Sequence, residues 1–296
     1  MALQRKFRAR FWELDESQPD DPRLELPNAY SGDHRRPVEY YERNPGTQYY
    51  SIARLTIQFA YGEVGAGTGF MVNNNILMTA GRCLWNDYGP AARLVASFGQ
   101  YEVNGRSYWH EHRHGTAVLM SKNLSHSTDF AIVLLQDWDV DIVPIVPFRW
   151  YDTPLQANMI LYITGYPAER DRHCNTMYEG WQPVTWDLLS EGGWLKHGIL
   201  TFPGQSGSPI LLADKQHFIG IYVAGDGTAP GNFGTRGPYG PHMISSYERA
   251  LRGKAFDLRT PEAQWGAITT YDVVISMPDA GASISYYGEQ PSLLEY

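Results

Sequence analysis

Short strand-like runs repeat along the chain from about residue 49 to residue 223, and they constrain the fold more than any other feature. Each run contains β-branched or aromatic residues, and Gly, Asn or Pro separates neighbouring runs. Examples are ARLTIQFAY, GTGFMV, NILMTA, DFAIVLL, MILYITGY, SPILL and FIGIYVA. Short strands at close spacing, with turn residues between them, are typical of all-β sandwiches and barrels. We therefore predict an all-β fold.

One segment after these runs has the spacing of a helix. In HMISSYERALRG, Ile244, Tyr247 and Leu251 repeat at helical intervals, and Gly253 follows as a stop signal. The tail beyond it holds one more strand candidate, YDVVISM, and then a polar stretch. Residues 1–47 are polar and proline-rich without a sustained period, which predicts an extension that wraps a surface.

Charge and hydropathy narrow the classes of partner. The formal net charge of -8 argues against a broad nucleic-acid surface, which needs an excess of clustered Lys and Arg. No apolar run reaches a membrane-spanning length, and the N-terminus lacks the apolar core of a signal peptide. We expect neither a nucleic-acid nor a membrane partner, and the missing leader favours the cytoplasm over secretion. The two cysteines, Cys83 and Cys174, are read as buried free thiols, with a single disulfide as the alternative.

The most informative motif is TFPGQSGSPILL at residues 201–212. A serine between glycines, directly before a buried strand, can expose its hydroxyl as a nucleophile. The backbone N–H groups of Gly204 and Ser206 would then point at one spot and form an oxyanion hole. Taken alone, this motif is equally explained by an ordinary tight turn.

Two further motifs precede the serine, in the chain order histidine, aspartate, serine that one β-barrel architecture uses. TAGRC at 79–83 and STDFAIVLL at 127–135 stand where one β-barrel architecture carries its histidine and its aspartate. GTGFMV precedes the first of these motifs, ITGYP lies at 163–167, and IGIY follows the serine. On these stretches and the three ordered motifs, the chain resembles the chymotrypsin-like serine endopeptidases from about Tyr49 to Leu251. Within that class it is most similar to the glutamyl endopeptidases, the staphylococcal serine protease-like group.

This resemblance implies two packed antiparallel β-barrels and a set of site residues. Ser206 matches the nucleophile, Asp129 the carboxylate that orients the base, and Gly204 with Ser206 the oxyanion amides. Thr201 matches a threonine that helps line the primary specificity pocket, although an ordinary strand residue explains it equally well. The implied divisions are an N-terminal extension (1–47), a first barrel (48–148), a second barrel with the terminal helix (149–253) and a C-terminal extension (254–296).

Arg82 departs from the family pattern, because it falls where the catalytic histidine belongs. Imidazole accepts the serine proton at one nitrogen and donates to the aspartate through the other. A guanidinium group has only donors and stays protonated, so it can pair with Asp129 but cannot take the proton from Ser206. We expect a bidentate pair between Arg82 and Asp129, and a site that is structurally sound but chemically silent.

Other departures bear on specificity and activation. The glutamyl endopeptidases carry a histidine on the strand after the serine, where this chain has Tyr222, so preference for Glu is not carried over. Gln205 stands where trypsin-type activation needs an aspartate. His110, His112 and His114 would share one face of a strand and could hold a transition metal, but a solvent-facing strand or loop is favoured. We expect no cofactor and no metal.

His126, His173, His197, His217 and His242 have no motif support and are read as surface or packing residues. No substitute for the missing base is therefore visible in the sequence.

Two functional hypotheses compete. The first is a serine endopeptidase-family protein that acts on peptides or proteins but is inactive or severely impaired, either as a natural pseudoprotease or as a substituted form of an active enzyme. The second is a peptide- or protein-binding module that uses the retained cleft by strand addition. Its ligand could be the chain's own N-terminal extension, whose acidic residues (Glu13, Asp15, Asp20 and Asp21) would suit a cleft containing Arg82. A lipase-type α/β hydrolase is set aside, because GQSGSP lacks the second glycine of that motif and continues into a strand-like run.

Overall fold

The computed structural model describes residues 5–20, 34–103, 106–125, 128–137, 145–151, 153, 155–156, 159–168, 175–184, 194–225, 232–235 and 241–277. Strands dominate these residues, and the described part of the chain holds one α-helix. In chain order the elements are β1 (Arg5–Glu13), β2 (Arg36–Pro37), η1 (Tyr40–Arg43), η2 (Tyr49–Ser51), β3 (Ile52–Phe59), β4 (Val64–Asn73), β5 (Ile76–Thr79), η3 (Gly81–Cys83), β6 (Trp85–Asn86), β7 (Gly89–Val103), β8 (Arg106–Ser121), β9 (Ala131–Leu135), β10 (Arg149–Trp150), β11 (Ile160–Gly165), β12 (Tyr178–Pro183), β13 (Trp194–His197), β14 (Pro209–Leu212), β15 (His217–Gly225), β16 (Asn232–Thr235), α1 (Pro241–Gly253), β17 (Leu258–Trp265) and β18 (Ile268–Met277).

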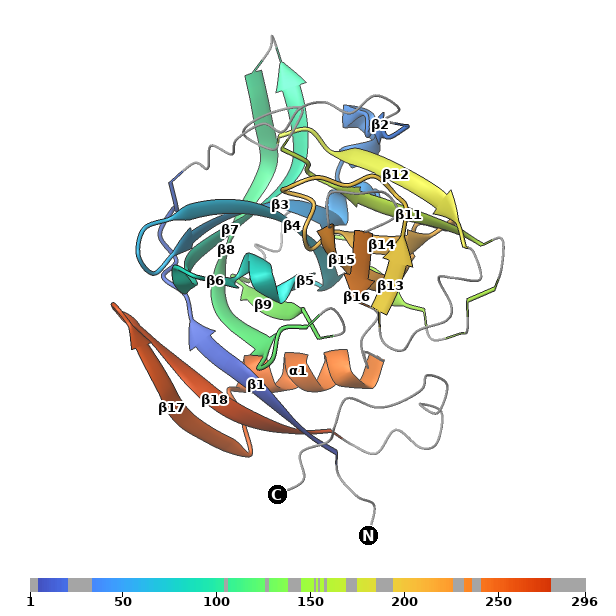
Figure 1. Ribbon diagram of the computed structural model, residues 1–296. Coiled ribbons are helices and arrows are strands. Elements are labelled where there is room, and N and C mark those ends of the chain that lie inside the picture. The colour runs from blue at the N-terminus through green and yellow to red at the C-terminus, as the bar shows by residue number, and fades with distance from the viewer. Residues whose placement is uncertain are drawn as a thin grey trace.

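Six strands of the first half close into an antiparallel barrel (Figure 1). They follow the order β8-β9-β5-β4-β3-β7, and β7 pairs with β8 to complete the circle. Closure satisfies the backbone of every strand in the circle, so the barrel has no open edge. Large side chains such as Leu55, Phe70 and Leu119 are fully buried in it. The predicted all-β class is confirmed.

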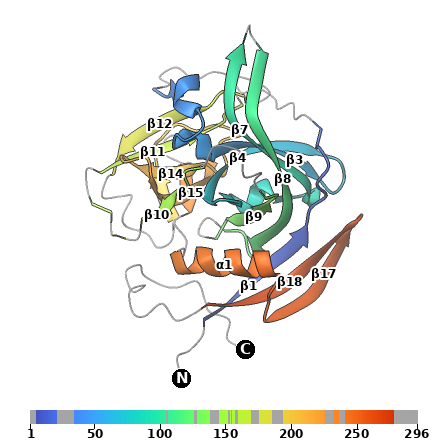
Figure 2. The same cartoon turned by 180° about the vertical axis from the view of Figure 1, so that it is seen from behind.

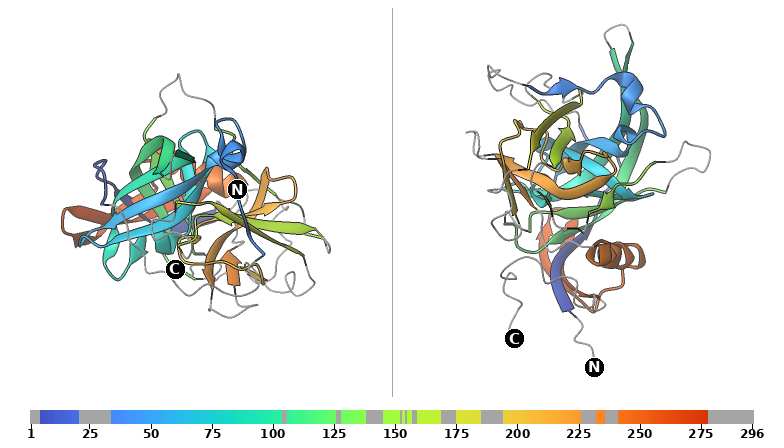
Figure 3. Two further views of the ribbon diagram at one scale, coloured as in Figure 1. Left: turned by 90° about the horizontal axis from the view of Figure 1, so that it is seen from above. Right: turned by 90° about the vertical axis from the view of Figure 1, so that its right-hand side faces the viewer.

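The second half forms another sheet, in the order β13-β16-β15-β14-β11-β12-β2, with β10 added alongside β15. Its apolar core includes Leu161, Ile163, Ile210 and Ile219, all nearly or fully buried. Seen from above, this sheet lies beside the first barrel (Figure 3). A barrel plus a second sheet is the arrangement expected for a chymotrypsin-like double barrel.

The first strand and the last two strands of the described chain extend the sheet of the first barrel. β1 pairs with β8 on one side and with β18 on the other, and β17 continues the sheet outward (Figure 2). The strand expected at 271–277 is confirmed as part of β18, whereas the sequence analysis missed β1 and β17. In β1 the period-two signal exists, since Ala9 and Phe11 are buried, whereas Arg8 and Arg10, which alternate with them, are not. The charged residues of β1 obscured that signal.

The predicted helix is confirmed as α1. Although α1 follows the second sheet in the sequence, it packs against β8, β9 and β18 of the first (Figures 1 and 3). The ring of Tyr247 lies 5.4 Å from that of Phe130, which directly precedes β9. Among the described residues no helix is both long and apolar enough to cross a membrane.

Candidate active site

Arg82 and Asp129 are brought together by the pairing of β5 with β9. Thr79 at the end of β5 lies opposite Ala131 at the start of β9, so the residues just outside these strands become neighbours. Asp129 is fully buried, with an exposed fraction of 0% for its side chain. Two strands of the barrel thus position a carboxylate that the sequence places 47 residues away from its partner.

Both carboxylate oxygens of Asp129 accept hydrogen bonds from Arg82. The Arg82 backbone N–H donates to Oδ1 at 2.9 Å, and the guanidinium Nε donates to Oδ2. The pair expected from the sequence is present, but it uses one main-chain donor and one guanidinium donor instead of a guanidinium fork. The Arg82 side chain is 40% exposed. Its two Nη atoms make no hydrogen bond to any residue that the structure describes.

Glycine is required on the loop that carries Ser206. Gly204 and Gly207 have φ angles of +94° and +90°, which side-chain-bearing residues rarely adopt. A Cβ on Gly207 would also lie 2.0 Å from the carbonyl oxygen of Thr68. The Gly207 N–H donates to the Tyr222 carbonyl at 2.8 Å, which attaches the loop to β15. These contacts fix the path of the chain on either side of Ser206.

The loop also reaches the first barrel. The Ser206 carbonyl oxygen accepts from the Thr68 N–H at 2.9 Å and from the Cys83 thiol at 3.4 Å. Cys83 is a free, buried thiol, and burial raises its pKa to about 12, so it remains a donor at neutral pH. Because Cys83 directly follows Arg82, this contact places the Arg82 loop next to the Ser206 loop. Cys174 lies outside the described residues.

Three donors around Ser206 have no hydrogen-bond partner among the residues that the structure describes. Neither the N–H of Gly204 nor that of Ser206 donates to any described residue, and the Ser206 hydroxyl has no partner there either. An oxyanion hole requires backbone N–H groups that are not engaged elsewhere. That these amides receive an oxyanion, and that Ser206 is the nucleophile, stay predictions.

Two polar aromatic residues, Tyr222 and His197, lie close to the Ser206 loop. Tyr222 on β15 is nearly buried, and the ring of His197 on β13 lies 5.8 Å from its ring. Burial lowers the pKa of His197 to about 3, so this imidazole is neutral. Burial raises the pKa of Tyr222, while the Thr201 hydroxyl and the charge of Arg82 act in the opposite direction. Thr201 and Arg82 therefore lie close enough to Tyr222 to influence its ionisation. His197, which the sequence analysis read as a surface or packing residue, is a buried packing residue.

The remaining sequence candidates lie elsewhere. His110, His112 and His114 are on the predicted strand, now β8, and His112 Nδ1 shares a hydrogen bond of 2.8 Å with Ser97. In the described ranges no group of three His, Cys, Asp or Glu residues is arranged to hold a metal ion. His126 and His173 lie outside those ranges.

The N-terminal acidic residues have other partners in the structure. Glu13 pairs with Lys254, and the Asp15 carboxylate accepts from Arg93 at 3.0 Å. Asp21 lies outside the described residues, so an N-terminal segment in the cleft stays a prediction.

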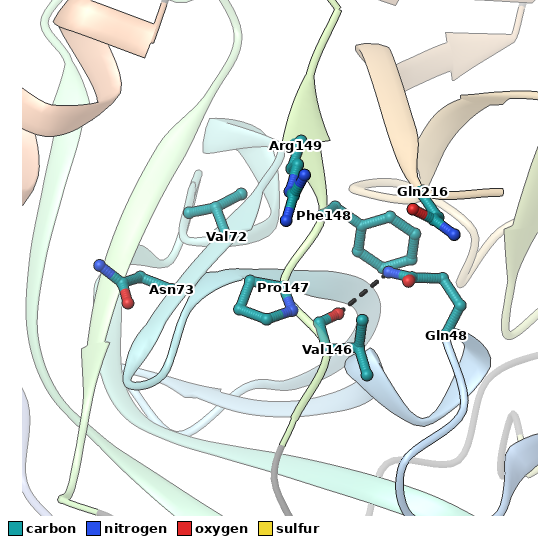
Figure 4. Close-up of a pocket in the computed structure, with 8 residues that line it drawn as sticks. All are labelled: Gln48, Val72, Asn73, Val146, Pro147, Phe148, Arg149 and Gln216. Carbon is teal, nitrogen blue, oxygen red and sulfur yellow. Dashed lines mark hydrogen bonds between the residues drawn. The ribbon is translucent and has the colours of Figure 1, made fainter. Parts of the chain in front are cut away.

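A separate open pocket lies between β4 and the segment that leads into β10 (Figure 4). Gln48 donates through Nε2 to the Val146 carbonyl at 3.0 Å across one side of it. Its lining contains none of Arg82, Asp129 and Ser206. The residues that line it are Gln48, Val72, Asn73, Val146, Pro147, Phe148, Arg149 and Gln216.

Comparison with known proteins identifies the family. A family model described as a trypsin-like peptidase domain matches residues 67–221, slightly more than half of the chain. This chain belongs to the trypsin-like peptidase domain family. The matched range of this peptidase domain includes both the Arg82 and Ser206 loops.

Relatives and solved structures agree with this assignment. An extracellular metalloprotease of Bacillus subtilis (strain 168) is 28% identical over 197 residues, which cover 64% of this chain and 60% of that protein. A Glu endopeptidase solved in complex with MPD matches with a TM-score of 0.54 at 21% identity, covering 69% of this chain and 90% of that one. The protease Anisep from Arthrobacter nicotinovorans matches with a TM-score of 0.52 at 15% identity, covering 70% and 98%. The resemblance to chymotrypsin-like serine proteases is confirmed. At 21% and 15% identity, the two solved structures support the fold alone.

Sequence reasoning missed two residues that position the serine. Thr68 and Cys83 hold the Ser206 carbonyl, but the sequence analysis gave Thr68 no role of its own and read Cys83 only as a buried thiol. Thr68 is part of GTGFMV, which was read only as a connecting strand. No local pattern could indicate its contact, because it joins residues 138 positions apart.

Proposed function

We propose that this chain is a serine endopeptidase-family protein whose hydrolytic step is disabled by Arg82. The observation that carries the proposal is that Arg82 donates to both oxygens of the buried Asp129, the contact that a catalytic histidine would make. A guanidinium group stays protonated and has no acceptor atom. Arg82 thus occupies the carboxylate that would orient a base and cannot itself take the proton of Ser206.

The rest of the proposed machinery would act on a peptide bond. A scissile carbonyl oxygen would be held by the N–H groups of Gly204 and Ser206, and the Ser206 hydroxyl would attack the carbonyl carbon. Loss of the histidine from a serine triad costs a factor of about a million in turnover, about 8 kcal/mol of barrier. Substrate positioning by the loop would survive this loss, whereas proton transfer would not.

The proposed substrate class is a peptide or protein, with no preference assigned for Glu. One matched structure is named a Glu endopeptidase. In this chain Tyr222 lies near Thr201 and packs against the neutral His197, and neither Tyr222 nor His197 supplies a positive charge to receive a carboxylate. We therefore do not extend that specificity to this chain.

The test is hydrolysis of peptide esters and casein by the chain with Arg82 in place, its Arg82→His variant and the Arg82→His/Ser206→Ala double variant. The proposal predicts that Arg82→His raises turnover by several orders of magnitude and that the added Ser206→Ala removes the gain. If the chain with Arg82 in place shows Ser206-dependent turnover comparable to that of Arg82→His, Arg82 does not disable the site. An Arg82→His variant that stays at the background of the double variant would mean that more than the base is missing.

That last outcome would favour a second function, peptide binding without hydrolysis. The exposed Arg82 guanidinium, whose Nη atoms have no partner among the described residues, supports it, because such a group can bind a peptide carboxylate. Fluorescence anisotropy with a peptide and its C-terminally amidated form would test it. Binding that requires both the free carboxylate and Arg82 would support this function.

A further inference from the structure

A glutamine directly before Ser206 is shared between the serine loop and a distant part of the chain. Gln205 is fully buried, and its side-chain Oε1 accepts from the Phe202 N–H at 3.0 Å. The same oxygen accepts from Arg35 Nη1 at 3.1 Å. The Gln205 side chain therefore joins the start of the loop to an arginine 170 residues earlier.

The Arg35 side chain is held in place by its surroundings. The residue is only 9% exposed, and its guanidinium carbon lies 4.4 Å from the centre of the Phe202 ring and 5.7 Å from that of Tyr178. Guanidinium groups bind favourably over aromatic faces, more so when they are desolvated. These two rings and the Gln205 amide oxygen thus restrain the orientation of the charged group.

A short N-terminal segment, residues 34–43, places Arg35 at this position. Its strand β2 pairs with β12, where Arg36 lies opposite Glu179, and the Val38 N–H donates to the Met177 carbonyl at 2.9 Å. Arg36 also forms ion pairs with Glu42 at 2.7 Å and with the buried Glu179 at 3.2 Å. The segment is attached to the second sheet directly after Arg35, at residues 36–38.

We propose that Arg35 is a positioning residue that orients the amides of Gly204 and Ser206 through Gln205. Oxyanion-hole donors act only if they are held before the reaction, since their value lies in not having to reorganise. Removing the Arg35 donor would leave Gln205 Oε1 with one hydrogen bond and an unfilled space beside Phe202. The loop would then occupy several orientations, and the two amides would converge on one point less often.

The catalytic test rests on the proposed function and uses the Arg82→His background. Arg35→Met is expected to lower kcat at least about tenfold, the equilibrium equivalent of one hydrogen bond to a charged group, with KM changed less than about twofold. Arg35→Lys, which keeps a cationic donor, should retain more of the parent kcat than Arg35→Met. A kcat within twofold of the parent in Arg35→Met would overturn the proposal.

Arg113→Met is the matched control, because Arg113 is also a buried arginine and bonds to backbone carbonyls of the first barrel instead of to the Ser206 loop. It should lower thermal stability while leaving kcat within twofold. If Arg35→Met lowers kcat no more than Arg113→Met does, the role of Arg35 is merely structural and the proposal fails.

A second readout separates this inference from the proposed function. Amide hydrogen exchange is measured in the natural chain, with Arg82 in place, for peptides covering residues 202–208. Arg35→Met is expected to speed exchange there at least about tenfold, and Arg113→Met is expected not to. This result would support the role of Arg35 even if Arg82→His restored no hydrolysis. Unchanged exchange in Arg35→Met would overturn it whatever the activity.

Discussion

Removing the Arg82 side chain should destabilise the fold, because it takes a charged donor from the buried carboxylate of Asp129. In Arg82→Ala the backbone N–H still donates to Oδ1, but Oδ2 loses its hydrogen bond to Nε. Breaking a fully buried ion pair costs about 3–5 kcal/mol. The Arg82 side chain is 40% exposed, so water can replace part of what is lost. We expect the free energy of unfolding to fall by about 2 kcal/mol, within the range for hydrogen bonds to charged groups.

The assay is urea denaturation of the chain with Arg82 in place and of the variants Arg82→Ala, Arg82→His and Asp129→Asn. The double variant Arg82→Ala/Asp129→Asn completes a double-mutant cycle. Arg82→His should lose less than about 1 kcal/mol, because an imidazole N–H can replace Nε as the donor to Asp129. The cycle should give a coupling energy of about 1–2 kcal/mol between the two side chains. A loss below about 0.5 kcal/mol in Arg82→Ala, or no coupling, would refute the view that Arg82 satisfies this carboxylate.

Two further predictions concern the residues around the site. Gly207→Ala should lower the free energy of unfolding by at least about 3 kcal/mol, because a Cβ would meet the Thr68 carbonyl at 2.0 Å and φ is +90°. Gly62→Ala, at φ +91° with nothing within 4 Å, is the control for backbone strain alone, and equal losses in thermal melts would show that the close contact relaxes. His197 should make stability depend on pH: its pKa is lowered to about 3 in the folded state, so stability is complete above about pH 6.5 and declines toward pH 3 as the unfolded chain binds the proton. Between pH 8 and pH 5 the loss should be about 2 kcal/mol, and it should disappear in His197→Phe; the same loss in both proteins would contradict this assignment.

The all-β class, the helix and the order of the three motifs could be read from the sequence because they depend on neighbouring residues. Short β-branched runs between turn residues favour strands wherever they occur, and Ile244, Tyr247 and Leu251 repeat at the period of a helix. The chemical limit on Arg82 is also a property of the residue itself, since a guanidinium group lacks an acceptor in any environment. The sequence therefore predicted the family, the site loops and the departure within them.

Other features arise only when distant segments meet. The sequence did not indicate that Arg5–Glu13 pairs with Ile268–Met277, because strand pairing depends on the register of partners more than 250 residues apart. It predicted a guanidinium fork on Asp129, but the direction of the backbone after β5 supplies one of the two donors. The contact between Arg35 and Gln205 likewise depends on the second sheet, which pairs with the neighbouring residues Arg36 and Pro37. Local patterns determine which segments become strands and which residues have reactive chemistry, whereas long-range packing decides which of these residues touch.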